Sequence, residues 1–217
     1  MTERDVKSFG SIAANPYAWP FDGQWSASDT ALLLLGLQNG MIAELSAGAE
    51  LEAAASLLDA ANSAGIAVVA ARRGAGRGID GAQDPLAARR RLLGDRVPDK
   101  HSPEWQISDR LALPGDAILV DFGGDNAFIR TGLEDELLRR GVRNLIVTGL
   151  PTEGIVHATQ RAANDMGFEC IAVADACKGT SDPRHTAQLR ITTFGNGLFG
   201  AVAATADVLA ALKTSQE

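Results

Sequence analysis

Short apolar runs alternate with longer segments of helical periodicity along this chain. Residues 31–37 form a continuous apolar run, the pattern of a strand buried on both faces of a parallel sheet. Apolar side chains then recur at helical spacing between residues 51 and 66, which predicts a helix that ends at Gly65. The same pattern predicts further strands at residues 66–71, 117–122, 144–148 and 170–174, and further helices at 131–140, 153–166 and 198–212.

This alternation of strand and helix sets the fold class. A strand, a helix and a following strand usually form a parallel pair with a right-handed crossover. We therefore predict an α/β fold with three layers, α/β/α, and a doubly wound, mostly parallel sheet of five or six strands. Nothing marks a second domain, so residues 1–217 are expected to form one domain with an N-terminal arm at residues 1–28. The ligand site of such a sheet lies beyond the carboxyl ends of the strands, where the strand order reverses.

Composition and charge exclude several classes of function. The 217 residues carry 27 acidic and 20 basic side chains, a net charge of −7, which disfavours a nucleic-acid-binding protein. No apolar run approaches the roughly 18 residues of a membrane span, and the N-terminus lacks the apolar core of a secretory signal. With Cys170 and Cys177 as the only cysteines, a reducing, cytoplasmic location is expected.

Neither a cofactor site nor a metal site is predicted. The glycine-rich stretch at residues 74–81 lacks both the lysine of a phosphate-binding loop and the spacing of a dinucleotide turn, so we expect a mobile loop there. The three histidines, His101, His157 and His185, are too widely separated to indicate a metal-ligand motif.

Arginines form one basic cluster in this acidic chain. Arg72 and Arg73 follow the second predicted strand, and three more arginines stand at residues 89–91. The simplest interpretation is a solvated helix face. A rim that steers an anion toward the site, or a subunit contact, stays open as the alternative.

Three segments resemble the signature segments of a known family. They are residues 30–40 (TALLLLGLQNG), 116–128 (DAILVDFGGDNAF) and 147–159 (VTGLPTEGIVHAT). In order and spacing they resemble those of the isochorismatase-like cysteine hydrolases, with a pattern closest to the ureidoacrylate and biuret hydrolases. The likeness runs from about residue 19 to residue 212. The resemblance implies the α/β/α fold, a small-molecule ligand and a homo-oligomer, either a dimer or a tetramer.

The resemblance also implies where the catalytic residues should lie, and this chain departs from the family there. The family carries Asp, Lys and a nucleophilic Cys in the three segments, whereas this chain has Gly36, Phe122 and Ile155. Gly36 has no side chain, Phe122 has no charge, and Ile155 has no heteroatom that could attack a carbonyl carbon. A pocket lined by these residues suits an apolar or planar group better than a charged one.

Other parts of the family's pocket are retained. Gln38 follows the first strand as in the family, and residues 149–152 match the turn whose backbone N–H groups form the family's oxyanion hole. Relatives hold the second peptide of this turn cis without a proline, and a proline lowers the cost of that isomer, so we predict a cis Leu150–Pro151 bond. The substrate-binding residues expected here are Gly36, Gln38, Trp105, Phe122, Leu150, Pro151, Thr152, Gly154, Ile155 and His157.

Polar residues near the strand ends could have taken over the chemistry. Asp125 and Asn126 follow the third strand, where apolar neighbours would raise the pKa of the Asp125 carboxyl and fit it for acid–base catalysis. Glu153 opens the next helix, and His157 lies one turn further on, where the two could pair. Structural alternatives stay open, because Gly-Gly-Asp-Asn also forms turns, Glu153 suits any helix N-terminus, and His157 could make a surface contact. Cys177 is a further alternative, as a relocated nucleophile.

Two functional hypotheses follow from these residues. The first is an isochorismatase-family hydrolase-like protein that acts without the cysteine triad, by acid–base chemistry on a small planar carbonyl, amide or enol-ether substrate. Its catalytic residues would be Asp125, Glu153 and Asn126, with backbone donors of residues 150–155 polarising the oxygen. The alternative is a catalytically silent protein that binds a small metabolite or partners an active paralogue.

Overall fold

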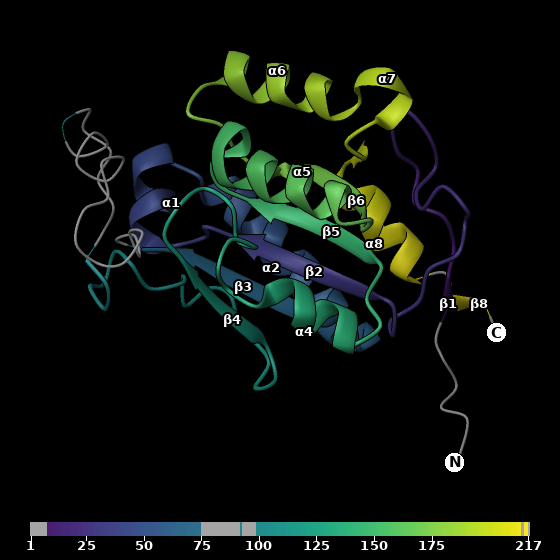
Figure 1. Ribbon diagram of the computed structural model, residues 1–217, viewed down its shortest axis with the longest axis horizontal. Helices are drawn as coiled ribbons and strands as arrows, with labels where there is room; N and C mark the ends of the chain where they lie inside the picture. The colour runs from purple at the N-terminus through teal and green to yellow at the C-terminus, as the bar shows by residue number, and fades with distance from the viewer. Residues whose placement is uncertain (1–7, 75–91, 93–98, 214, 217) are drawn as a thin grey trace.

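Six parallel strands form the centre of the molecule (Figure 1). The computed structural model describes residues 8–74, 92, 99–213 and 215–216. The strands are β2 (Thr30–Leu35), β3 (Ala67–Arg73), β4 (Ile118–Phe122), β5 (Asn144–Gly149), β6 (Glu169–Cys177) and β7 (Ala201–Ala203). Their order in the sheet is β4-β3-β2-β5-β6-β7, and every neighbouring pair is parallel. The chain therefore builds outward on one side of β2, returns to its other side with β5, and builds outward again.

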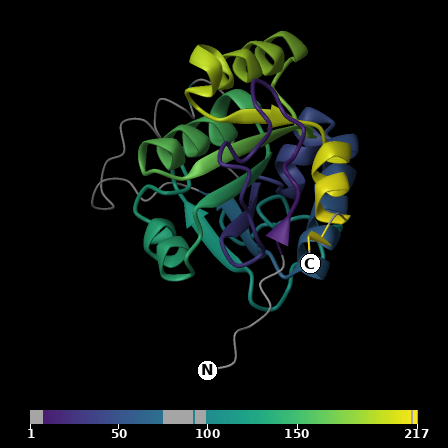
Figure 2. The ribbon, with the colours of Figure 1, turned by 90° about the vertical axis from the view of Figure 1, so that its right-hand side faces the viewer.

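Helices cover both faces of this sheet, which makes the three layers that the alternation predicts (Figure 1 and Figure 2). Helices α2 (Gly48–Ala64) and α8 (Thr205–Lys213) lie on one face, and α4 (Leu133–Arg139) and α5 (His157–Asp165) lie on the other. The predicted fold class is confirmed. Within the described ranges, no helix is long and apolar enough to cross a membrane. The other helical segments that the structure describes with bounds are α1 (Asn39–Leu45), the π-helical turn η2 (Thr152–Val156), α6 (Asp182–Thr192) and α7 (Phe194–Gly197).

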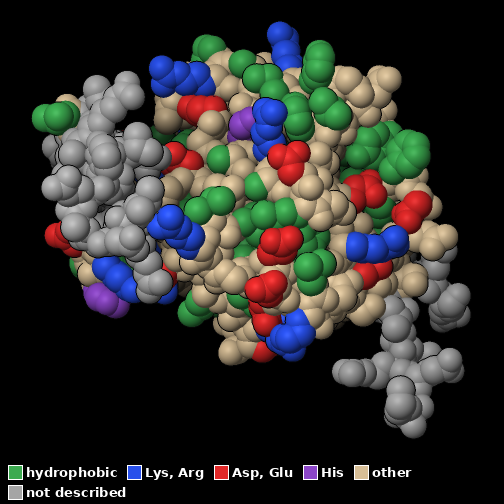
Figure 3. All heavy atoms as spheres, viewed as in Figure 1, with side chains coloured by type: hydrophobic (Ala, Val, Ile, Leu, Met, Phe, Trp, Pro, Cys, Tyr) green, Lys and Arg blue, Asp and Glu red, His purple; other side chains and the backbone are tan. Residues whose placement is uncertain are grey.

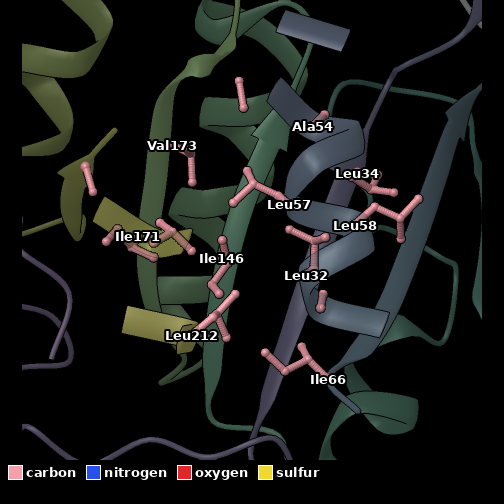
Figure 4. Packing of buried hydrophobic residues seen from close by; sticks show 14 of the residues in the cluster. Leu32, Leu34, Ala54, Leu57, Leu58, Ile66, Ile146, Ile171, Val173 and Leu212 are labelled. Carbon is pink, nitrogen blue, oxygen red and sulfur yellow. The ribbon is translucent and has the colours of Figure 1, made fainter. Parts of the chain in front are cut away.

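The two faces of the sheet bury separate hydrophobic clusters. Successive leucines of β2 point to opposite faces, so Leu32 and Leu34 pack with α2 and α8, while Leu33 and Leu35 pack with α4 and α5. Figure 4 shows the first cluster, in which Leu57 of α2 points toward the strands. All six residues of β2 are buried, which explains why this strand is a continuous apolar run rather than an alternating one.

The N-terminal segment packs against the first of these clusters. Ile12 and Trp19 are fully buried, and their backbones exchange hydrogen bonds of 2.7 and 2.9 Å. The short strand β1 (Ser8–Phe9) pairs antiparallel with β8 (Ser215–Gln216), so residues from both ends of the chain lie side by side.

The C-terminal segment differs from its prediction. Residues 198–212 are predicted as one helix, but Ala201–Ala203 forms the edge strand β7, and α8 begins only at Thr205. Alanine favours helices in isolation, yet residues 201–203 pair with β6, and this sheet pairing overrides the local preference. Asp175 fixes the boundary, because its Oδ1 accepts hydrogen bonds from the N–H and the hydroxyl of Thr205 at 2.7 and 2.8 Å.

Other differences from the sequence prediction are local. The helix expected at residues 153–166 begins as the π-helical turn η2 before it continues as α5. Helices α1, α6 and α7 are not predicted from the sequence. Apart from Gly74, the glycine-rich stretch at residues 74–81 lies outside the described residues, and so do the arginines at 89–91.

Candidate functional site

The strand order reverses between β2 and β5, which places the candidate site beyond the carboxyl ends of these two strands. Gly36 follows β2, and Leu150 follows β5. The N–H of Gly36 donates to the carbonyl of Ala71, and the N–H of Leu150 donates to the carbonyl of Leu35, both at 2.9 Å. These bonds extend the strand ladders by one residue and hold the two chain segments side by side.

Gly36 and Ile155 face each other at this point. Gly36 has a φ of 65°, a conformation that side-chain-bearing residues rarely adopt. A β-carbon on Gly36 would stand 3.1 Å from Cδ1 of Ile155 and would collide with the carbonyl oxygen of Leu150. The Ile155 side chain therefore lies where a side chain at position 36 would begin. The fold brings together two of the three positions that the resemblance singles out.

The third of these positions, residue 122, also carries an apolar side chain. Phe122, at the end of β4, is 4% exposed and Ile155 is fully buried, and both belong to the hydrophobic cluster under α4 and α5. Neither side chain supplies a charge or a lone pair. The three positions therefore offer neither a nucleophile nor a base that could activate one.

The turn after β5 contains the predicted cis Leu150–Pro151 bond. Three backbone N–H groups in and just after this turn are used within the protein. The N–H of Thr152 donates to the carbonyl of the residue that follows β6 at 2.9 Å, and those of Gly154 and Val156 donate to the Pro151 carbonyl at 3.2 and 3.3 Å. An oxyanion hole needs donors that aim at the developing charge, so these three N–H groups do not provide one in this arrangement.

Glu153 anchors a neighbouring loop. Its Oε1 accepts hydrogen bonds from the N–H of Thr180, at 3.0 Å, and from the Thr180 hydroxyl. Its Oε2 is buried beside Gly179 and has no hydrogen-bond partner among the described residues. The pairing with His157 that the sequence left open does not form, because His157 bonds to α6 instead. Glu153 lies in the first turn of a helical segment, as the structural alternative has it, but its side chain bonds to Thr180.

His157 and Thr152 dock helix α6 onto the turn η2. Nδ1 of His157 lies 2.5 Å from Nε2 of Gln188, and Oγ1 of Thr152 lies 2.8 Å from Nδ1 of His185. Burial is the main cause that lowers the pKa of His157 below 6.5, and the nearby charge of Arg161 lowers it further. A neutral imidazole can accept the Gln188 amide proton through Nδ1, which assigns His157 a packing role between two helices.

Gln38 joins three segments of backbone. Its Nε2 donates to the carbonyls of Arg73 and Trp105 at 3.0 and 2.8 Å, and its Oε1 accepts from the N–H of Arg73 at 2.8 Å. Both amide protons and the amide oxygen are thus engaged, and the residue is 2% exposed. Gln38 holds together segments that border the site, and its expected contact with substrate stays a prediction.

Asp125 and Asn126 have different surroundings. Oδ1 of Asp125 lies 3.4 Å from Nε of Arg73, and the Asp125 side chain is 40% exposed, so the apolar environment expected for it is wrong. Oδ1 of Asn126 accepts the N–H of Phe128 at 2.9 Å, the bond of an Asx turn. The turn alternative therefore holds for Asn126. Of the expected catalytic residues, Asp125 has the carboxylate that reaches solvent beside the site.

The cations around Trp105 are the part of this region that the sequence did not predict. The guanidinium of Arg72 stacks 3.9 Å from the centroid of the buried Trp105 ring, and Nζ of Lys100 lies 5.7 Å from it. Both cations pair with Asp121, at 2.8 and 3.3 Å. Arg73 is 8% exposed, so its interpretation as part of a solvated helix face is wrong. In the sequence, the feature that could have indicated this cluster of cations is the pair of successive arginines after an apolar strand.

Neither cysteine resembles a relocated nucleophile. Cys170 and Cys177 are both buried. Burial raises the pKa of the Cys177 thiol to about 12 and that of Cys170 further still, so both remain protonated thiols near neutral pH. Among the described residues, no group of three or more His, Cys, Asp or Glu side chains could hold a metal ion.

Sequence comparison identifies relatives of this chain. A family profile described as the isochorismatase domain matches residues 30–207. The ureidoacrylate amidohydrolase RutB of Stutzerimonas stutzeri is 28% identical over 77% of this chain and 78% of that protein. The isochorismatase family protein YecD of Escherichia coli O157:H7 is 33% identical, over 41% of this chain and 48% of that protein. This match and two others to Bacillus subtilis proteins of the same family span less than half of each relative's length.

Solved structures share the fold. A cysteine hydrolase from Pseudomonas syringae pv. phaseolicola superimposes with a TM-score of 0.75 over 98% of this chain and 99% of that chain, at 21% identity. N-carbamoylsarcosine amidase from Thermoplasma acidophilum superimposes with a TM-score of 0.68 over 82% and 96%, at 18% identity. At these identities the likeness establishes the fold alone, and the chemistry has to be argued from the residues of this chain.

Proposed function

This chain belongs to the isochorismatase family, and we propose that it is a catalytically silent member that holds a small metabolite or partners an active paralogue. The contact between Ile155 and Gly36 carries the proposal. At this contact, packed hydrocarbon stands at the position of the family's nucleophile, and a bare backbone stands at the position of the family's aspartate. Phe122 does the same at the position of the family's lysine.

The proposed loss of catalysis involves more than one catalytic side chain. A single positioned acid or base is worth about 10²–10⁴ in rate, and residues that act as a unit fail together when one is removed. Here all three are replaced, and the N–H groups of Thr152, Gly154 and Val156 already have carbonyl acceptors. Nucleophilic attack is therefore unsupported by these positions, and the N–H groups of Thr152, Gly154 and Val156 are not available to stabilise an oxyanion.

One observation favours a second candidate function. Asp125 keeps a carboxylate 40% exposed at the end of β4, beside the Arg73 guanidinium. A carboxylate held in this way could act as a general base toward water, on a small planar carbonyl, amide or enol-ether substrate. Glu153 and Asn126 are not assigned a part in this chemistry. The loop engages Oε1 of Glu153 while its Oε2 is buried, and the turn engages the amide oxygen of Asn126.

Turnover of ureidoacrylate decides between the two candidates, since RutB from Stutzerimonas stutzeri is a relative. The purified full chain is incubated with ureidoacrylate, and ammonia release is compared with that of a relative that has the intact triad. We expect no ammonia release above background. If the protein binds a small metabolite, that metabolite should raise its melting temperature, and if it partners an active paralogue, the two proteins should form a complex. Release at a rate comparable to the active relative contradicts the silent assignment.

Asp125 provides the matched test if slow release is found. Asp125→Asn should then lower the rate by about 10²–10⁴-fold, the usual worth of a positioned base. Asp165→Asn, at an exposed position on α5, is the control and should leave the rate unchanged. Equal rates in both variants would remove Asp125 as the base.

We also propose a homo-oligomer, a dimer or a tetramer, formed through the α6–α7 region. Ile191, Phe194 and Leu198 are 45%, 66% and 54% exposed. Hydrophobic side chains gather over α6 and α7 at the upper edge of the molecule (Figure 3). Exposed apolar patches of this kind are typical of contact surfaces, and a second copy of the chain is the proposed occupant.

A further inference from the structure

Helix α6 lies on the body of the protein without joining its hydrophobic core. As far as the structure describes the two hydrophobic clusters, neither includes a residue of α6, and the buried side chains of this helix are the polar Gln188 and Thr192. Leu189 is partly buried, and Ile191 is 45% exposed. Figure 1 and Figure 2 show α6 beyond α5, at the upper edge of the molecule. Because apolar burial is the main force that holds a helix in place, α6 is weakly held.

Polar contacts with one short segment attach α6 to the body instead. The segment comprises η2 and the first residue of α5. Three side-chain contacts join it to α6 and the loop before it: Glu153 with Thr180, Thr152 with His185, and His157 with Gln188. A hydrogen bond within a protein replaces one to water, so its net contribution to stability is small. These contacts therefore hold α6 less firmly than an apolar face would.

The closed position of α6 leaves one buried oxygen unsatisfied. Oε2 of Glu153 is buried and has no hydrogen-bond partner among the described residues. It lies against Gly179, where an added β-carbon would stand 2.7 Å from this oxygen and 2.9 Å from the backbone nitrogen of His185. Water would reach the oxygen if α6 moved away. Since an unsatisfied buried oxygen is costly, this gain favours the open position.

The chain is anchored on both sides of α6. Before the helix, the carbonyl of Lys178 accepts the N–H of Thr152 at 2.9 Å, and after it the carbonyl of Phe199 accepts Nε2 of Gln160 at 2.8 Å. Just after the helix, residues 195–197 all have positive φ, and two of the three are glycines. Glycine adopts such angles at little steric cost, which suits a hinge. Residues 179–198 are therefore a segment that can move between two fixed ends.

We propose that residues 179–198 form a lid over the turn η2, and that α6 opens and closes as one unit. The structure shows the closed lid. The open lid uncovers Thr152, Glu153 and His157, on the segment that follows β5 and carries Ile155. This inference goes beyond the proposed function, and it holds whether or not the protein binds a metabolite.

Native-state amide hydrogen exchange of the full chain tests the lid. An isolated helix of 11 residues is only marginally stable in water, so the amides of α6 lose their hydrogen bonds when it detaches. We expect them to exchange at least about tenfold faster than those of α8, with nearly equal protection along α6. Helix α8 is the matched reference, because it is shorter, at 9 residues, but buries Val208, Ala211 and Leu212.

A second copy on the proposed α6–α7 contact surface would hold the lid closed from outside, because Ile191 belongs to both. Exchange is therefore measured at a concentration at which light scattering gives the mass of the monomer. If every concentration gives an oligomer, the variant Phe194→Asp with Leu198→Asp takes the place of the wild type.

Two variants test the contacts that close the lid. Gly179→Ala presses a carbon against Glu153 and His185, and Gln188→Ala removes the bond to His157. Each should speed exchange in α6 about threefold to tenfold, the range for one hydrogen bond, and leave exchange in α8 unchanged, which also shows that the variant is folded. Gly115→Ala, where the added carbon meets no atom within 4 Å, is the control and should change neither helix.

Three outcomes would overturn the inference. They are protection of α6 equal to that of α8, protection that declines gradually toward the ends of α6 as in simple fraying, and unchanged exchange of α6 in both folded variants. None of them bears on catalytic silence, because ureidoacrylate turnover is measured independently. Turnover in turn rejects the silent assignment whether or not α6 opens.

Discussion

Cδ1 of Ile155 lies 3.1 Å from the place where a β-carbon on Gly36 would stand. The two residues are 119 positions apart in the chain and meet because β2 and β5 are neighbours in the sheet. The two residues therefore share one packing site. A glycine at position 36 makes room for an isoleucine at position 155, and the isoleucine in turn leaves little room for any side chain at position 36.

Gly36→Ala should destabilise the protein strongly. Alanine would have to adopt a φ of 65°, and its β-carbon would press on the Leu150 carbonyl and on Ile155. Strain at such a φ costs about 1–3 kcal/mol and overpacking about 1–3 kcal/mol, so we expect a loss of about 2–6 kcal/mol in the free energy of unfolding. Urea unfolding measures it. Gly115→Ala, where no atom lies within 4 Å of the added carbon, is the control and should change little.

A double-mutant cycle should reveal coupling between these two positions. Ile155→Ala alone should cost about 2–5 kcal/mol, because the side chain is fully buried. In the double variant the alanine at position 36 no longer meets an isoleucine, so the combined loss should be smaller than the sum of the single losses. Additive losses would mean that the two side chains do not share space.

The cysteines should be inert in the folded protein. The Cys177 thiol has a pKa raised to about 12 by burial, and both cysteines are inaccessible. We expect no reaction with a thiol reagent at pH 8 and two reactive thiols after unfolding in urea. Any hydrolytic activity should likewise survive the double variant Cys170→Ala/Cys177→Ala. A thiol that reacts quickly in the native state would restore Cys177 as a nucleophile candidate.

Stability should fall as the pH drops below about 6.5, with His157 as the cause. Its pKa is lowered in the folded state by burial and by Arg161, so the unfolded chain binds the proton more readily. The stabilisation is complete above 6.5 and is lost as the pH falls through the lower, folded-state pKa. The depressed pKa values of Glu52 and Glu136 act in the same direction, but below about 4.5.

The variant His157→Gln isolates this contribution. Its amide can still bond to Gln188, and it does not titrate. We expect the free energy of unfolding of the variant to vary less with pH between 7 and 5 than that of the wild type. Parallel pH profiles for the two proteins would show that His157 does not titrate in this range.

The oligomer should depend on the α6–α7 surface. Light scattering at micromolar concentration should give two or four times the chain mass of 22.7 kDa. Phe194→Asp with Leu198→Asp places charge on the proposed contact and should shift the protein toward the monomer. Leu119→Asp is the control, since Leu119 is 57% exposed on the edge strand β4. A monomeric wild type would end the proposal.

The sequence by itself determined the fold class and its central strands. The leucine run of β2 is apolar on every residue because both faces of a central parallel strand are covered by helices, and that pattern is local enough to recognise. The cis Leu150–Pro151 bond was also predictable, since it depends on a turn motif and a proline adjacent in the chain. The presence of Gly36, Phe122 and Ile155 was equally visible, as it concerns residue identity alone.

Tertiary structure decided which polar groups were already engaged. Gln38 and Glu153 looked like free site residues, but each is bonded to backbone that the fold brings close. Asn126 bonds only two residues along the chain, in a local turn. β7 was missed because a short alanine-rich strand is stabilised by its partner β6 rather than by its own preferences. Hydrogen bonding and burial between distant segments depend on three-dimensional distance, which residue identity and spacing along one chain do not specify.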